Sequence, residues 1–182
     1  MIHRLSFVLA LSLLAGGLTA NADHLPLKLL ARGHVETKLA GLDLKKVKLS
    51  DIVRLYGKPS RVVLSTYDDP NVSQQDDYYW TKRNLNLHIQ IERLSRLKWE
   101  EVQLIEVLPG TSRELGVTGA GLRLGHSLHD LESRYGRRYH LRNIPKRKIH
   151  DIMIQWRREA YSLVATLDRN DRIVAFALST PE

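Results

Sequence analysis

The chain has 182 residues, and its 28 lysine and arginine residues outnumber 20 aspartate and glutamate residues, giving a formal net charge of +8. It contains no cysteine, which excludes disulfides, thiol chemistry and lipid attachment at a cysteine that follows a signal sequence. The positive charge favours an anionic partner, such as membrane headgroups, an envelope polymer or an acidic protein, although a basic surface that serves solubility alone is the alternative.

The first 22 residues have the pattern of a secretory signal peptide. His3 and Arg4 form a positive start, residues 5–18 are almost wholly apolar, and Ala20-Asn21-Ala22 supplies small residues for cleavage. The apolar run is shorter than the roughly 20 residues that a membrane-spanning helix needs. We therefore predict cleavage after Ala22 and a periplasmic or secreted protein without a transmembrane segment. Nucleic acid fits the charge but is not expected as the partner of an exported protein.

Residues 23–46 are predicted to form an N-terminal arm, because Pro26 and Gly33 interrupt any long periodicity; this arm could add an edge strand to the segment after it. The first structural unit is expected over residues 47–109. It begins with a helix whose apolar residues follow the i, i+3, i+4, i+7 spacing and which Gly57 ends. These apolar residues are Leu49, Ile52, Val53 and Tyr56. Strands are predicted at residues 62–66, 78–80, 85–92 and 102–108, and the third alternates strictly between apolar and polar positions.

A glycine-dense connector is expected over residues 110–121. A phosphate-binding loop is the alternative, because a strand precedes this stretch and a helix follows it. The spacing does not fit that alternative, since Gly119 and Gly121 are followed by Gly125 rather than by a glycine three positions on, and no Lys-Ser or Lys-Thr pair ends the loop.

The second structural unit is expected over residues 122–182. Its helix has Leu128, Leu131 and Tyr135 on one face, while Ser127 and Asp130 can cap its start and Gly136 can end it. Strands are predicted at residues 138–141, 152–157, 161–167 and 173–179. The last is apolar on both faces, which is typical of an interior strand.

The helix of the first unit, residues 49–57, returns in the second as residues 128–136, with the same leucine, aspartate, tyrosine and glycine positions. We therefore predict an α+β protein of two tandem units. Each unit is expected to have one helix followed by an antiparallel sheet of about three to four strands, with the helices on one sheet face and the other face open to solvent.

The segment from Gly121 to Gly136 spells G-L-x-L-G-x-S-x-x-D-L-x-x-x-Y-G and is followed by an aromatic-bearing strand. In this layout the chain resembles the SmpA/OmlA outer-membrane assembly lipoproteins and the tandem units of the beta-lactamase-inhibitor-protein fold. The resemblance implies a cell-envelope protein-binding module without enzymatic activity. The chain departs from it in having no lipid-attachment cysteine, and in spelling the first helix start as Leu44-Lys-Lys-Val.

The strongest local signal is a basic segment at residues 134–148 that contains no acidic residue and is interleaved with aromatic side chains. Guanidinium groups bind phosphate or carboxylate through paired donors, so this segment is the predicted binding site. The corresponding loop of the first unit carries Asp68, Asp69, Asp76 and Asp77, and whether the two loops contact each other stays open. The predicted site residues are Arg134, Arg137, Arg138, Tyr139, His140, Arg142, Lys146, Arg147 and Lys148.

No catalytic motif is present, because the chain has no Gly-x-Ser-x-Gly elbow, no His-Glu-x-x-His and no cysteine nucleophile. His126 and His129 are three positions apart, and His140 or His150 could supply a third metal ligand, but spacing alone does not show it. We interpret them as surface histidines at a helix start, and neither a metal nor another cofactor is predicted. We expect an exported cell-envelope protein that binds a protein, an anionic polymer or a lipid headgroup through an exposed sheet face and the basic loop. The alternative is a small periplasmic hydrolase or transferase that acts on an anionic envelope polymer.

Overall fold

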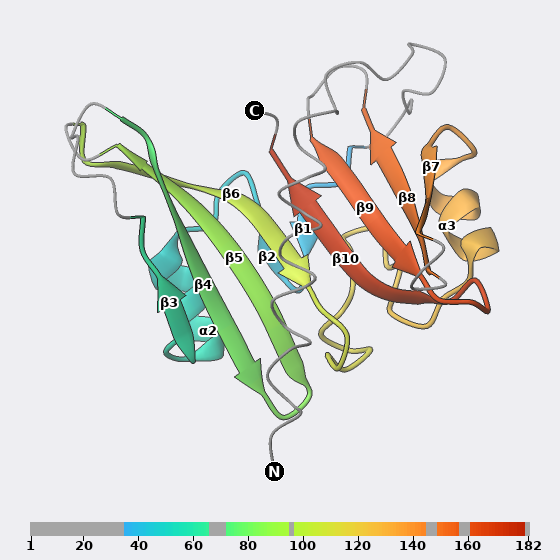
Figure 1. The fold of residues 1–182 in the computed structure, drawn as a ribbon, viewed down its shortest axis with the longest axis horizontal. Coiled ribbons are helices and arrows are strands. Elements are labelled where there is room, and N and C mark those ends of the chain that lie inside the picture. Colours follow the sequence, from blue (N-terminus) through green and yellow to red (C-terminus); the bar gives the residue numbers. More distant parts are fainter. Residues whose placement is uncertain (1–34, 66–71, 95–96, 145–148, 157–160, 181–182) are drawn as a thin grey trace.

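The computed structural model describes residues 35–65, 72–94, 97–144, 149–156 and 161–180. This part of the chain is mostly β-structure (Figure 1). Eight strands form one antiparallel sheet in the order β3-β4-β5-β6-β10-β9-β8-β7, and β1 and β2 form a separate two-stranded sheet. The strands are β1 (Lys38–Leu39), β2 (Leu42–Asp43), β3 (Arg61–Val63), β4 (Gln74–Lys82), β5 (Leu85–Leu94), β6 (Trp99–Val107), β7 (His140–Ile144), β8 (Ile149–Gln155), β9 (Ser162–Leu167) and β10 (Ile173–Ser179).

The predicted α+β class with a separate sheet in each of two units is wrong. Strands β6 and β10 pair with each other, with Val107 opposite Phe176 and Leu104 opposite Ser179, so the strands of both halves belong to one continuous sheet. The described part of the arm, residues 35–46, adds no edge strand to this sheet, because its strands β1 and β2 pair with each other as a ladder. Two separate sheets would leave the backbone groups of β6 and β10 at open edges, whereas pairing these strands satisfies those groups.

Two helices occur in the described residues, α2 (Leu49–Tyr56) and α3 (Leu128–Tyr135), both at their predicted positions. Each is followed by a glycine with positive φ, Gly57 at 77° and Gly136 at 79°, which is the backbone region that favours glycine. The predicted cap of α3 is also confirmed, because the Ser127 side chain accepts from the Asp130 N–H and the Asp130 carboxylate accepts from the Ser127 N–H.

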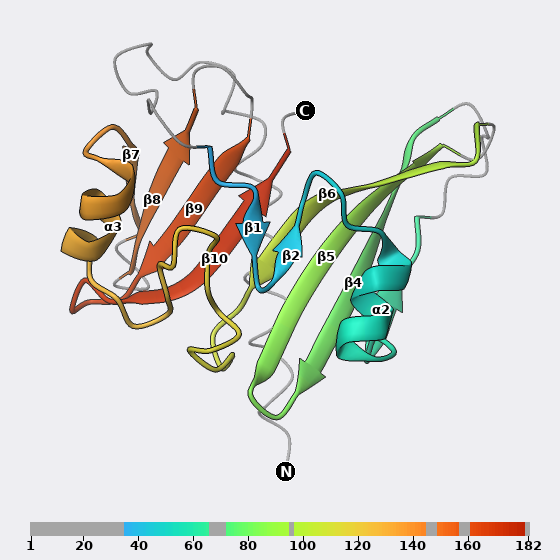
Figure 2. The same cartoon turned by 180° about the vertical axis from the view of Figure 1, so that it is seen from behind.

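One face of the sheet, which we call the helix face, is covered by α2 and the β1–β2 pair, as Figure 2 shows. Helix α3 packs on the same face at the other end of the sheet, since the Tyr135 ring meets the Trp156 ring edge-on at 6.0 Å. The core lies here and includes the fully buried side chains of Trp80, Ile105 and Leu178. None of the described helices is long and apolar enough to cross a membrane.

The opposite face, which we call the second face, carries one continuous row of side chains across all eight strands. The prediction that this face is open to solvent is wrong at its centre, because the side chains of Tyr79, His88, Glu106, Val164 and Met153 are only 3–9% exposed. Polar groups in such a buried row need partners within the protein. The row runs Arg61, Tyr79, His88, Glu106, Ala177, Val164, Met153 and His140, each opposite the next on neighbouring strands.

Candidate functional site

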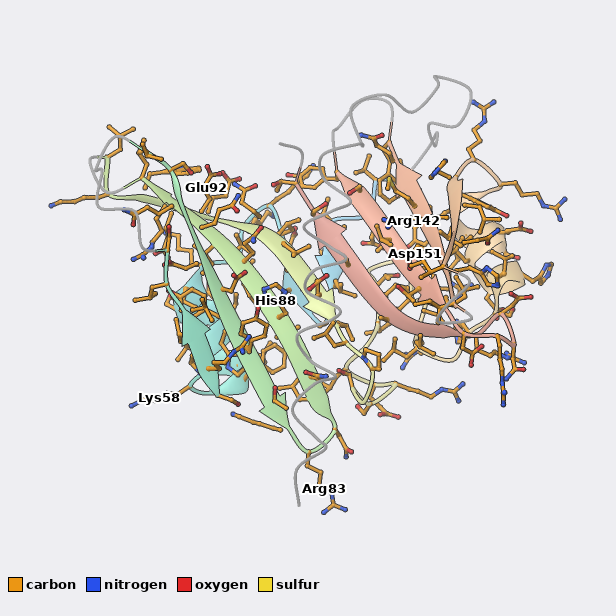
Figure 3. All side chains as sticks on the ribbon, viewed as in Figure 1. Lys58, Arg83, His88, Glu92, Arg142 and Asp151 are labelled. Atoms are coloured by element: carbon orange, nitrogen blue, oxygen red, sulfur yellow. The ribbon has the colours of Figure 1, made fainter. Side chains whose placement is uncertain are left out.

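The centre of the second face holds a histidine between two carboxylates. His88 on β5 lies 2.5 Å from the Glu106 carboxylate on β6 through Nδ1, and 2.8 Å from the Asp77 carboxylate on β4 through Nε2. Glu106 is directly opposite His88 in the ladder, and Asp77 is its diagonal neighbour on β4. Cross-strand neighbours on one face are close enough for such contacts. Figure 3 shows His88 on the face of the sheet turned to the viewer.

Aromatic stacking extends this cluster to the edge of the sheet. The Tyr79 and His88 rings are nearly parallel, at an angle of 6° and a centroid distance of 4.5 Å. The Arg61 guanidinium lies 4.1 Å from the centroid of the Tyr79 ring. A cation on the face of an aromatic ring is attracted by the ring's quadrupole. The cluster is therefore held from four adjacent strands, β3, β4, β5 and β6.

The electrostatics of the cluster favour a charged histidine. Burial alone lowers the pKa of His88, but the hydrogen bonds and negative charges of Asp77 and Glu106 outweigh it and raise that pKa from 6.5 to about 9. At neutral pH both ring nitrogens then donate, one to each carboxylate. In this state neither nitrogen has a lone pair with which to accept a proton.

A second polar cluster lies on the same face at the other end of the sheet. Asp151 on β8 is buried and accepts a hydrogen bond of 2.8 Å from the Thr166 hydroxyl on β9. Arg142 on β7 is directly opposite Asp151 in the ladder, and Figure 3 marks both residues. Burial raises the pKa of Asp151, while the Thr166 hydrogen bond and the charges of Arg142 and His150 partly oppose that shift.

The residues of the predicted basic site do not form one group in the structure. Arg134 donates to the Ala120 carbonyl oxygen at 3.0 Å, and Glu132 on α3 accepts both from Arg137 at 3.0 Å and from the Tyr139 hydroxyl at 2.8 Å. These contacts fold part of the segment back onto α3 and the connector. Lys146, Arg147 and Lys148 lie outside the described residues.

Arg137 and Arg138 precede β7, and His140 and Arg142 belong to it, at the end of the sheet order. Strand β7 is the last strand of the sheet order and pairs only with β8 within the described structure. We use the name β7 edge for the residues Arg137, Arg138, His140, Leu141 and Arg142. Leu141 is 51% exposed and His140 is also exposed. The β7 edge thus combines positive charge, an exposed apolar side chain and a strand backbone whose outer side has no ladder partner among the described residues.

The prediction of an acidic loop is wrong for Asp76 and Asp77, the two of its aspartates that the structure describes, because both lie on strand β4. Asp76 is fully buried on β4, where it pairs with Arg93 and accepts from the Ser65 N–H at 3.0 Å. Asp77 belongs to the His88 cluster. Both carboxylates therefore bind partners within the first half of the sheet, and Asp68 and Asp69 lie outside the described residues.

Within the described ranges, no three histidine or acidic side chains are arranged to hold a metal ion.

The described fold is thus a mostly β protein with two polar clusters on one sheet face and a basic strand at one sheet edge. No protein-family model matches the chain, and no curated protein matches it either. Among solved structures, it is similar to a DUF4309 family protein (YjgB) from Bacillus subtilis subsp. subtilis str. 168, with 18% identity over 77% of this chain and 82% of that one. The TM-score is 0.44, a likeness too distant to support a statement about function.

Proposed function

We propose that this is an exported cell-envelope binding protein that recognises an anionic protein or envelope component at the β7 edge. The observation that carries the proposal is the sheet order, which leaves β7 as a terminal strand with Arg138, His140 and Arg142 on or beside it. The net charge of +8 supports attraction of an anionic partner. The burial of the second face favours recognition at this edge over recognition across the sheet face.

The chemistry of the edge suits carboxylates and phosphates. Guanidinium groups offer paired donors to either anion, and the Arg137 side chain is 81% exposed even though it contacts Glu132. An exposed ion pair of this kind is weak, so a partner's anion can compete for Arg137. The attraction should weaken with salt, because the screening length falls from about 10 Å at 0.1 M to about 3 Å at 1 M.

Charge reversal at the edge tests the proposal. We expect Arg137→Glu together with Arg138→Glu to weaken binding to polyaspartate and to phosphatidylglycerol vesicles by at least about tenfold at 0.1 M salt, mainly through slower association. The measurement is surface plasmon resonance at low and high salt, with circular dichroism to check the fold.

The matched control is Lys58→Glu together with Arg83→Glu, which changes the net charge by the same amount at two exposed sites of the first half. Figure 3 marks both residues far from β7. We expect this control to lose less than about threefold in affinity. Equal losses in both double variants, or no binding of either probe by the unaltered protein, would refute the site.

Export is a separate prediction. Removal of residues 1–22 is expected, because Ala20-Asn21-Ala22 places small residues at the cleavage positions. Intact-mass measurement of the exported protein checks the prediction, and an N-terminus at Asp23 is the expected result. A mass that includes Met1 would contradict both cleavage and the proposed location. These residues lie outside the described structure.

A further inference from the structure

We infer that the partner of the β7 edge is an extended acidic polypeptide, which adds to the sheet as a ninth strand beside β7. This inference rests on the proposed function and specifies the partner and the way in which it binds.

The backbone of β7 provides the first argument. Its five residues pair with β8 from His140 opposite Met153 to Ile144 opposite Ile149. The backbone groups of an antiparallel strand point alternately to its two sides, so the side of β7 away from β8 keeps N–H and C=O groups without a strand partner in the described structure. Such an edge is a template for the main-chain hydrogen bonds of another extended chain.

The side chains of β7 provide the second argument, because they set different requirements on its two faces. His140 and Arg142 point to the second face, as their ladder partners Met153 and Asp151 do. Leu141 points to the helix face and is 51% exposed. A strand that alternates acidic and apolar residues matches this pattern, with carboxylates beside Arg142 and His140 and an apolar side chain beside Leu141.

The same charges argue against a second copy of this chain as the occupant. Two β7 strands laid side by side would bring the positive side chains of both copies together, and like charges across a strand pair are destabilising. Basic residues on an edge strand are a known means of preventing such self-pairing. An acidic strand meets no such repulsion and gains from the charges that exclude the second copy.

The other end of the sheet fits an acidic strand less well. Strand β3 has three residues, which allow fewer main-chain hydrogen bonds than the five of β7. Its one basic side chain, Arg61, already lies over the Tyr79 ring, and Val62 and Val63 are apolar and exposed. Charge and strand length together therefore favour β7.

Amide hydrogen exchange followed by NMR tests the inference. The probe is a seven-residue peptide of alternating aspartate and valine, acetylated and amidated at its ends. We expect it to slow exchange of the β7 amides that face away from β8 by at least about tenfold, because those amides become hydrogen-bonded. The control is the same peptide N-methylated at every residue, which keeps its carboxylates but cannot donate main-chain hydrogen bonds and should bind at least about tenfold more weakly.

The outcomes separate this inference from the proposed function. Protection of β7 by the unmethylated peptide alone supports strand addition. Equal binding of both peptides, or binding without protection of β7, would overturn strand addition and leave recognition by charge in place. Binding of phosphatidylglycerol vesicles without binding of the peptide would likewise overturn strand addition only. Failure of every anionic probe would overturn both.

Discussion

Replacing Glu36 with alanine is expected to lower the free energy of unfolding by on the order of 4 kcal/mol, because it leaves several buried donors without an acceptor. One oxygen of the Glu36 carboxylate accepts from the backbone N–H groups of Thr37 and Lys38 at 3.0 and 2.9 Å. The other accepts from the Ala120 N–H at 2.9 Å and from the Tyr135 hydroxyl at 2.7 Å. Glu36 itself is only 1% exposed.

The large effect follows from what this carboxylate joins. It ties the segment before β1 to the glycine-rich connector and to the last residue of α3, and it adds to the isolated bridge between Leu39 and Thr118 that already joins β1 to the connector. The Thr118 hydroxyl lies 2.8 Å from the Tyr135 hydroxyl and accepts from the Leu122 N–H, which extends the network. The connector approaches so closely that a Cβ at Gly119 would lie 2.6 Å from the Glu36 carboxylate.

Urea denaturation of Glu36→Ala, Glu36→Gln and Tyr135→Phe measures the effect. Tyr135→Phe removes one hydroxyl and should lower the free energy of unfolding by about 1–2 kcal/mol. Glu36→Gln keeps one acceptor oxygen, so its loss of stability should lie between those of Tyr135→Phe and Glu36→Ala. A double-mutant cycle of Glu36→Gln with Tyr135→Phe should show coupling, because the two side chains share a hydrogen bond. A loss below about 1 kcal/mol for Glu36→Ala would show that the network does not stabilise the fold.

The helices could be predicted from the sequence because their signals are local. The apolar spacing from Leu49 to Tyr56 and the glycines at 57 and 136 depend on residues a few positions apart. The caps of α3 are equally local, since Ser127 and Asp130 are three residues apart. Such patterns need no knowledge of the tertiary structure.

The single sheet could not be predicted from the same patterns. Alternation shows which residues of a strand share a face, but it does not show which strands are neighbours. Comparison of the two halves aligns Glu106 with Ala177 as corresponding positions, and the structure places these two residues directly opposite each other in the β6–β10 ladder. A repeated pattern therefore does not show whether the strands of the two halves form one sheet or two.

In the candidate sites, too, local features could be predicted from the sequence, whereas contacts between distant residues could not. The basic segment is visible in composition, although its contacts with Glu132 and Ala120 are not. His88 occupies a polar position of a strongly alternating strand, which indicates a solvated side chain. The register of the strands is what places Asp77 on one side of His88 and Glu106 on the other. The sequence signal for the cluster is limited to the alternation of β4 and β6, which shows which of their residues share a face.

Raising the pH from 6 to 10 is expected to remove about 3 kcal/mol of stability that depends on His88. Its pKa is about 9 in the folded protein and 6.5 for an unperturbed histidine side chain, so the folded state holds this proton more tightly. The stabilisation is fully present below about pH 6.5 and is lost as the pH rises through 9. Above that range a neutral ring can donate to only one of the two carboxylates.

The measurement compares urea denaturation of the unaltered protein and of His88→Gln across this pH range. At pH 6 the variant should be less stable by about 3 kcal/mol, because two carboxylates at a mostly buried site lose their cation. At pH 10 the two proteins should approach equal stability. Tyrosine and lysine residues titrate in both proteins, so their contributions cancel in the difference. A difference that stays constant from pH 6 to 10 would contradict a charged His88.

Glu106→Gln tests whether the two carboxylates cause this pH dependence. Glu106 is the more buried partner and makes the shorter contact with the ring, at 2.5 Å against 2.8 Å for Asp77. Replacing its carboxylate with an amide removes one negative charge but keeps a hydrogen-bond acceptor. The effect of burial, which lowers the pKa of His88, is then opposed by one negative charge fewer, so this pKa should fall. The pH range over which stability is lost should therefore move below that of the unaltered protein. An unchanged range would assign the pH dependence to groups outside this cluster.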